Sequence, residues 1–307
     1  MREVRADRHA HSQAQGMLQP SPHAARCEAC GTAMQRAPEL ERKFGKPPEQ
    51  PLWRCKACGH VQVHPIPSPE QIASYYRPGT PRRKLVGWAG GAARTTPSYL
   101  RRLRRVASDR PGTLLDVGFG SGSFLRAAHA MGYRVTGLDL RVDRFRPDFA
   151  CELREGHLRA GLFPDSSFDV VVAHHVLEHV EDFPQTLGVV QRLLKPGGYL
   201  LVELPHEMGS LSKHLKRVIL RRGYTKFTQL QHLRFFTVQS LRAALENIGL
   251  QVELCRSVPS YQLVQAPRAL LYAPLALLEG WTDFGHNLEA VARKAQPEPI
   301  GAPRPPA

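Results

Sequence analysis

Short apolar runs alternate with amphipathic segments through the second half of the chain. Runs bounded by glycine, proline or polar residues predict strands at 113–120, 133–140, 168–176, 199–205 and 250–258. Apolar residues at helical spacing predict helices at 123–132, 183–195 and 237–250, with Pro-Gly-Gly after the second and Thr237 as a candidate N-cap of the last. Strands that alternate with helices imply right-handed βαβ units and a mostly parallel sheet, so the pattern indicates an α/β fold.

A glycine-rich turn, VGFGSG, follows the first predicted strand and precedes a predicted helix. Gly118 and Gly120 let the backbone turn sharply and approach a ligand, and the helix presents its N-terminus to that ligand. Asp139 ends the next predicted strand, where a carboxylate can bind the hydroxyl pair of a ribose. The GxGxG spacing, without a Walker lysine after it, disfavours NAD and ATP. A purely structural βα turn is the alternative interpretation.

Four of the six cysteines form two CxxCG units, and the other two, Cys151 and Cys255, stand alone. Each unit presents two thiolates to one metal, and two such units make a closed tetrahedral site that suits structural Zn²⁺. A pair of redox dithiols is the alternative, but neither unit opens a helix after a strand. The predicted zinc ligands are Cys27, Cys30, Cys55 and Cys58.

The segment HVLEH places His175, Glu178 and His179 at positions i, i+3 and i+4, which would share one face if the segment were helical. HxxEH is also a zinc protease signature, which the surrounding α/β pattern disfavours. Histidine has an ordinary pKa that suits proton transfer, so His175, His179 and His232 are candidate catalytic residues. The alternatives are a structural pocket wall and a divalent metal site at Glu178 and His179, completed by His232.

Composition and the pattern of apolar residues divide the 307 residues into segments. Residues 1–22 and 296–307 lack an apolar period and are expected to be disordered. We predict a zinc ribbon at 23–66, a helical basic linker at 67–111, an α/β domain at 112–262 with a cap insertion at 206–236, and a C-terminal helical segment at 263–295. The N-terminus lacks an apolar signal region, and no run approaches the roughly 18 apolar residues of a membrane span, so we expect a cytoplasmic protein.

Positive charge exceeds negative charge strongly, since Lys and Arg total 42 against 27 for Asp and Glu, a net charge of +15. Such a balance favours an anionic partner, for example nucleic acid, a phosphorylated substrate or an anionic lipid surface. The alternative interpretation is that the abundance of Arg reflects a GC-rich genome, in which Arg replaces Lys at surface positions. The basic residues crowd the linker and the insertion, and they include Arg82, Arg83, Lys84, Arg94, Arg101, Arg102, Arg104, Arg105, Lys213, Lys216, Arg217, Arg221, Arg222, Lys226 and Arg234.

Several motifs in their order resemble those of class I S-adenosylmethionine-dependent methyltransferases over about 113–260. These motifs are LLDVGFGSG, GLDL, FPDSSFDVVVAHHVLEHVED and LLKPGGYLLVELP. QHLRFFTVQSLRAALENIGLQV resembles the closing segment of the small-molecule branch, and CKACGHVQVHPIPSPEQIASYY resembles the zinc knuckle that precedes many bacterial methyltransferases of sugar, polysaccharide or natural-product pathways. The resemblance implies a Rossmann-like seven-stranded sheet with helices on both faces and an antiparallel last strand.

The resemblance assigns cofactor-binding roles to residues of the first two motifs. It implies that Asp116, Gly118 and Gly120 shape the methionine end of an S-adenosylmethionine site. It also implies that Asp139 binds the ribose and that Leu140 flanks the adenine.

Later motifs supply the remaining positions that the resemblance implies. His157 and Leu158 stand where the third motif usually contacts adenine, although an acidic residue is commoner there. Ala173 and His174 end the fourth strand, where the substrate and the methyl group meet. Some quinone-pathway and small-RNA methyltransferases carry a metal-binding ExxEH cluster at the next position, where this chain has His175 instead of the first Glu.

We therefore expect a methyltransferase that moves a methyl group from S-adenosylmethionine to a small, anionic acceptor. The leading expectation is O-methylation of a sugar, glycan or lipid-linked precursor, with C- and N-methylation open. The alternatives are an RNA methyltransferase that uses the basic surface and a zinc-bearing interaction module without activity. Nucleic acid is therefore a less favoured partner than a small molecule.

Overall fold

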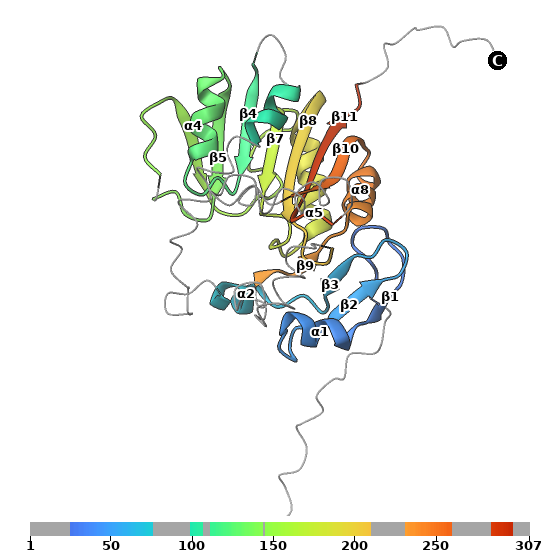
Figure 1. The fold of residues 1–307 in the computed structure, drawn as a ribbon. Helices are drawn as coiled ribbons and strands as arrows, with labels where there is room; N and C mark the ends of the chain where they lie inside the picture. The colour runs from blue at the N-terminus through green and yellow to red at the C-terminus, as the bar shows by residue number, and fades with distance from the viewer. Residues whose placement is uncertain are drawn as a thin grey trace, which may run out of the picture.

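Two β-sheets organise the computed structural model of the chain, which describes residues 25–75, 99–106, 111–143, 145–209, 231–259 and 284–296. A small four-stranded sheet lies beside one edge of a large seven-stranded sheet (Figure 1). Predictions for residues 1–22, for 76–98 and 107–110 of the basic linker, for 210–230 of the insertion, and for 260–283 and 297–307 lie outside the described residues. Within the described residues, no helix has the length and apolar character needed to cross a bilayer.

The large sheet has the strand order β10-β11-β8-β7-β4-β5-β6. The strands from β6 to β8 are parallel to their neighbours, and β11 is antiparallel to both β8 and β10. This order confirms the predicted α/β class and the antiparallel last strand. The strand bounds are β4 (Thr113–Val117), β5 (Arg134–Asp139), β6 (Cys151–Glu155), β7 (Phe168–His174), β8 (Leu194–Pro205), β10 (Leu250–Val258) and β11 (Asn287–Lys294).

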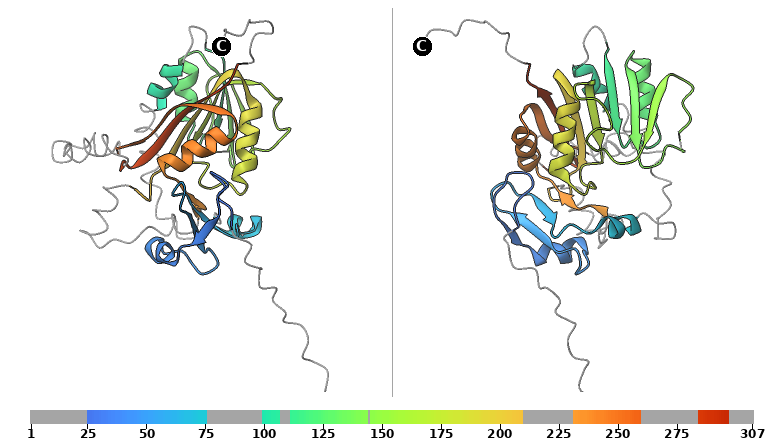
Figure 2. Two further views of the ribbon diagram at one scale, coloured as in Figure 1. Left: turned by 90° about the vertical axis from the view of Figure 1, so that its right-hand side faces the viewer. Right: turned by 180° about the vertical axis from the view of Figure 1, so that it is seen from behind.

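Helices cover both faces of the large sheet, which is why the middle residues of its central strands β4 and β7 are buried without alternation (Figure 2). α4 (Ser123–Ala130) and the helical residues 99–106 share one apolar cluster with the sheet. α5 (Phe183–Leu193) and α8 (Val238–Asn247) share the other. α8 begins where predicted, because the Thr237 hydroxyl accepts from the Ser240 amide in a capping box.

The small sheet contains β1 (Met34–Arg36), β2 (Leu52–Cys55), β3 (Val61–Val63) and β9 (Arg234–Phe235), with α1 (Pro38–Phe44) and α2 (Pro69–Tyr75) beside it. β9 comes from the predicted cap insertion and pairs antiparallel with β3. The described end of this insertion therefore completes the N-terminal sheet. Thr237 Oγ1 also donates to the Cys58 carbonyl at 2.7 Å, which fastens a cysteine unit to the start of α8.

The predicted C-terminal helical segment is wrong for residues 287–294, which form strand β11 in the large sheet. Leu288, Ala290 and Ala292 are fully buried there, between β8 and β10. Glu289 and Val291, on the opposite face, are buried as well, so burial does not alternate along this strand and its neighbours decide its form. The α/β fold therefore extends beyond residue 262.

Candidate functional site

The carboxyl ends of the parallel strands bring the predicted cofactor residues to one edge of the large sheet. Val117 pairs in register with Leu138 on one side and with Ala173 on the other. Gly118, Asp139 and His174 follow these three residues, so they lie side by side. Figure 1 shows that this edge faces the N-terminal sheet.

The glycine loop is held in left-handed backbone conformations, with φ of +73° at Gly118 and +57° at Gly120. The Gly118 amide donates to the Leu138 carbonyl at 2.7 Å. The Gly120 amide donates to Asp139 Oδ2 at 2.9 Å, while Oδ1 accepts from the Arg141 amide at 3.1 Å. These two bonds orient the Asp139 carboxylate beside the loop.

The other predicted cofactor residues surround Asp139. Asp116 is buried, and burial first and the charge of Asp139 second raise its pKa well above the ordinary range. Leu140 is 46% exposed, which leaves an apolar surface that a flat ring can cover. His157 is exposed and Leu158 is half-buried on the sheet's core. The Gly156 amide donates to the Asp139 carbonyl at 2.9 Å, so this loop starts next to Asp139.

His174 lies in an aromatic enclosure directly after the buried Ala173. Its ring stacks on Tyr99 with centroids 3.5 Å apart and meets the edge of Phe124 at 5.2 Å. Burial first, and then the charge of Arg102, lowers the pKa of His174 well below its ordinary value. His174 is therefore a neutral wall residue, and Tyr99 is a neighbour that the sequence analysis does not single out.

His175 adopts a left-handed backbone, φ +54°, which is rare for a residue with a side chain and is typical of functional sites. Its Nδ1 lies 3.6 Å from Glu178 Oε1, and its Nε2 lies 3.7 Å from Glu203 Oε1. Burial lowers the pKa of His175, but the two carboxylates outweigh burial and raise it to about 9. His175 is therefore an imidazolium at neutral pH.

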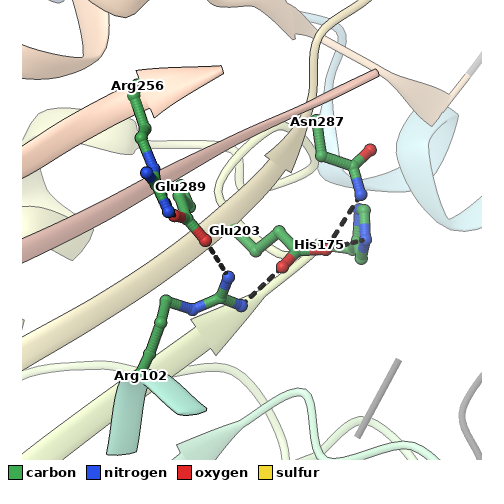
Figure 3. A network of polar contacts seen from close by, with 6 residues as sticks. All are labelled: Arg102, His175, Glu203, Arg256, Asn287 and Glu289. Atoms are coloured by element: carbon green, nitrogen blue, oxygen red, sulfur yellow. Dashed lines mark hydrogen bonds and ion pairs between the residues drawn. The ribbon is translucent and has the colours of Figure 1, made fainter. Parts of the chain in front are cut away.

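An ionic network with a buried centre of Arg102, Glu203 and Glu289 lies behind His175 (Figure 3). Arg102 donates to Glu203 and to Glu289 at 2.5 Å each. Asn287 also donates to Glu203, at 2.9 Å, and Arg256 to Glu289, at 2.7 Å. The prediction that Arg102 and Arg234 belong to a basic surface that binds an anionic partner is therefore wrong. Both are buried, and Arg234 pairs with Glu28 while it donates to two backbone carbonyls.

Glu178, His179 and His232 form a second cluster, with one donor atom of each within 4.8 Å of the others. Glu178 is 1% exposed, and neither carboxylate oxygen accepts a hydrogen bond from the part of the chain that the structure describes. Burial raises the pKa of Glu178, but His179 and His175 outweigh it and lower that pKa to about 2. A buried carboxylate is therefore kept ionised among histidine rings.

The two histidines of this cluster are each oriented by a second group. His179 Nδ1 lies 2.9 Å from the Gln231 carbonyl, so Nδ1 carries the proton and Nε2 faces Glu178 Oε1 at 3.6 Å. Burial lowers the pKa of His179 to about 4. His232 Nδ1 lies 3.0 Å from Glu207 Oε1. Histidine rings held in this way by a carbonyl and a carboxylate are characteristic of metal ligands.

The four cysteines of the CxxCG units also meet, with their Sγ atoms within 4.8 Å of one another. Cys27 and Cys58 Sγ are 3.6 Å apart, and Cys30 and Cys55 Sγ are 3.5 Å apart. Zn–S bonds of about 2.3 Å in a tetrahedron require sulfur separations of about 3.8 Å. The residues therefore fit a tetrahedral zinc ion.

The strand order, the glycine loop and the acid at the next strand end together define a class I S-adenosylmethionine-dependent methyltransferase. A family model described as a methyltransferase domain matches residues 92–254, more than half of the chain. The chain therefore belongs to this methyltransferase domain family.

Individual relatives are similar over the α/β domain. A probable S-adenosylmethionine-dependent methyltransferase of Mycolicibacterium smegmatis is 31% identical over 46% of this chain and 52% of its own length. A ubiquinone biosynthesis O-methyltransferase of Rhodopseudomonas palustris is 33% identical over 45% of this chain and 58% of its own. The chain thus spans between half and three fifths of these two relatives.

A solved structure agrees with the fold. The 1,6-didemethyltoxoflavin-N1-methyltransferase of Burkholderia thailandensis has a TM-score of 0.51 and 18% identity, covering 81% of this chain and 97% of that one. At this identity the likeness supports the architecture alone.

Proposed function

We propose that the protein transfers a methyl group from S-adenosylmethionine to a small-molecule acceptor. The observation that carries this proposal is the Asp139 carboxylate, oriented by the Gly120 and Arg141 amides at the edge where the glycine loop ends. In this proposal Asp139 binds the ribose and Leu140 covers the adenine. Asp116 and Gly118 shape the methionine end.

Five further residues complete the proposed arrangement. His157 and Leu158 lie on the adenine side, and Gly120 is part of the methionine end. Ala173 and His174 form the wall between the methyl group and the acceptor. Bound S-adenosylmethionine supplies a methyl group on an activated sulfonium. The protein therefore has only to align the acceptor atom with this methyl group and to remove a proton from the acceptor where needed.

His175 suits an anionic acceptor better than it suits proton abstraction. Because Glu178 and Glu203 raise its pKa to about 9, it carries a positive charge at neutral pH and is 35% exposed. We propose that it binds an anionic group of the acceptor by a charge-assisted hydrogen bond. His179 is neutral and, with His232, is left as the candidate base.

The acceptor class that we propose is a sugar, glycan or lipid-linked precursor methylated on oxygen. The O-methyltransferase name of the Rhodopseudomonas relative supports the reaction type. RNA methylation is the enzymatic alternative, and burial of Arg102 and Arg234 removes two residues from its basic surface. An RNA enzyme should co-purify with nucleic acid and release it steeply as salt rises.

Calorimetric titration of S-adenosylmethionine and S-adenosylhomocysteine into nucleic-acid-free protein tests the proposal. Asp139→Ala is expected to weaken binding at least about 100-fold, because two charge-assisted hydrogen bonds to ribose are lost. Asp143→Ala, which changes an exposed carboxylate paired with Arg141, should bind as the wild type does. No binding by folded wild-type protein would contradict the enzyme and favour an interaction module.

We also propose two metal sites. Zn²⁺ bound by Cys27, Cys30, Cys55 and Cys58 would stabilise the N-terminal sheet. A divalent ion bound by Glu178, His179 and His232 would act as a Lewis acid towards an acceptor hydroxyl. The second site is supported by the buried Glu178 carboxylate, whose oxygens accept no hydrogen bond from the described residues. A metal bound there would occupy His179 Nε2, and that atom could then not act as a base.

Glu178→Gln is expected to weaken Mn²⁺ binding by zinc-loaded protein more than about 100-fold, since an anionic ligand is removed. Electron paramagnetic resonance of free Mn²⁺ measures the binding, and Mn²⁺ prefers oxygen and nitrogen to the thiolates of the cysteine site. Glu246→Gln, on the exposed face of α8, is the matched control. Equal Mn²⁺ affinity in the two variants would refute the second site.

A further inference from the structure

Lys46 is a buried lysine that links the N-terminal sheet to the candidate site. It lies between α1 and β2 and is 8% exposed, although lysine is rarely buried. Its Nζ donates to Gln50 Oε1 at 2.9 Å and to the His232 carbonyl at 2.7 Å. A residue of the zinc-bearing module thus holds the backbone of a residue of the methyltransferase domain.

The surroundings of Lys46 act on its charge in opposite directions. Burial lowers the pKa of Lys46 to about 7, while the charge of Glu207, whose Oε1 lies 3.0 Å from His232 Nδ1, raises it. Lys46 Nζ also lies 5.5 Å from the centre of the Phe235 ring. Lys46 and Glu207 therefore hold His232 from two sides, one at its carbonyl and the other at its ring.

Residues next to His232 make the same connection between the two modules. The Leu233 amide donates to the Glu178 carbonyl at 2.8 Å, and the Leu233 carbonyl accepts from the Val63 amide at 2.8 Å. Arg234 pairs with Glu28 at 2.5 Å and donates to the Glu181 carbonyl at 2.9 Å. The segment 232–235 is thus bound to the N-terminal module on one side and to the Glu178 loop on the other.

We propose that Lys46 is a positioning residue for His232, so that the N-terminal module builds part of the acceptor side of the site. The proposal rests on the proposed function for its catalytic meaning, but the positioning itself is a structural claim. A buried ammonium costs free energy, and a methionine of similar length fills much of the same space. Methionine lacks the hydrogen bonds to the His232 carbonyl and to Gln50 Oε1, and it lacks the attraction to Glu207.

Hydrogen exchange of zinc-loaded protein measures this positioning without any acceptor. Lys46→Met is expected to speed amide exchange in 232–235 by about tenfold, since loss of a buried hydrogen bond costs up to about 1.5 kcal/mol. The ring signals of His232, assigned with His232→Gln in histidine-labelled protein, should shift in Lys46→Met. Lys46→Arg should restore both, and Lys56→Met, at an exposed position of the same module, should change neither.

Binding of S-adenosylhomocysteine separates this proposal from the proposed function. Asp139 and the glycine loop belong to other strands, so Lys46→Met should bind this ligand within about twofold of the wild type. If the wild type binds no S-adenosylhomocysteine but the His232 signals still shift, the enzyme assignment fails and the positioning stands. The positioning role would be overturned if amide exchange and the His232 ring signals were the same in Lys46→Met as in Lys56→Met. It would also be overturned if Lys46→Met sped amide exchange equally throughout the protein.

Discussion

Replacing Arg102 with methionine is expected to lower the free energy of unfolding by about 3–5 kcal/mol. The guanidinium pairs with Glu203 and Glu289 at 2.5 Å, and both carboxylates are buried. Methionine fills similar space but leaves these charges with less compensation. Urea unfolding at neutral pH measures the loss. Arg101→Met changes the exposed neighbour in the same helix and should cost less than about 0.5 kcal/mol.

The loss of unfolding free energy in Arg102→Met should depend on pH, and this dependence identifies the cause of the loss. Burial raises the pKa of Glu203, but Arg102 and His175 outweigh burial and hold it well below the ordinary range. A depressed carboxyl pKa stabilises the fold above the unfolded value of about 4.3, and this contribution is lost as pH falls. Wild-type stability should therefore fall below about pH 4.

In Arg102→Met, protonation of the buried carboxyls relieves part of the cost. The deficit relative to the wild type should therefore shrink between about pH 7.5 and about pH 5. A deficit that stays constant over this interval would indicate lost packing by the Arg102 side chain rather than uncompensated charge. Equal losses in Arg101→Met and Arg102→Met would contradict the role of the network.

The strands of the α/β domain were predictable because their signals are local. TLLDV is mostly apolar, with Asp116 as its one acid, and ends at a glycine turn, and both its faces are covered by helices. β9 has two residues and exists because the edge of β3 lies beside it, so no local pattern marks it. β11 likewise depends on its position between β8 and β10. Elements fixed by distant partners are therefore the ones that the sequence analysis missed or assigned wrongly.

The same distinction separates the site residues. Gly118 and Asp139 follow strands whose ends meet by topology, so their proximity was predictable. Arg102 stands in RRLRRV, where nothing local distinguishes it from its exposed neighbours, and its partners are 101 and 187 residues away. A single acid inside the apolar run LLVEL was the one available signal for Glu203. Nothing local pointed to a role for Lys46 at the site, because its acceptor on His232 is 186 residues distant.

Gly118→Ala is expected to destabilise the protein by about 2–5 kcal/mol, which combines the cost of a left-handed backbone with that of overpacking. Gly118 has φ +73°, and an added Cβ would lie 2.5 Å from Val176 Cγ2. Gly161→Ala is a matched control, because its φ is +78° and no atom lies within 4 Å of the added Cβ. It should lose only about 1–2 kcal/mol.

Val176→Ala in the Gly118→Ala background tests the close approach directly. This second change removes Cγ2 and leaves the Val176 Cβ at 3.9 Å, an ordinary contact. Chemical unfolding of both single variants and the double variant should give a favourable coupling of about 1–3 kcal/mol. Gly118→Ala should also weaken S-adenosylhomocysteine binding at least about tenfold, since the loop must move, whereas Gly161→Ala should not. Equal stability losses at the two glycines, with no coupling to Val176, would mean that backbone conformation alone requires glycine at 118.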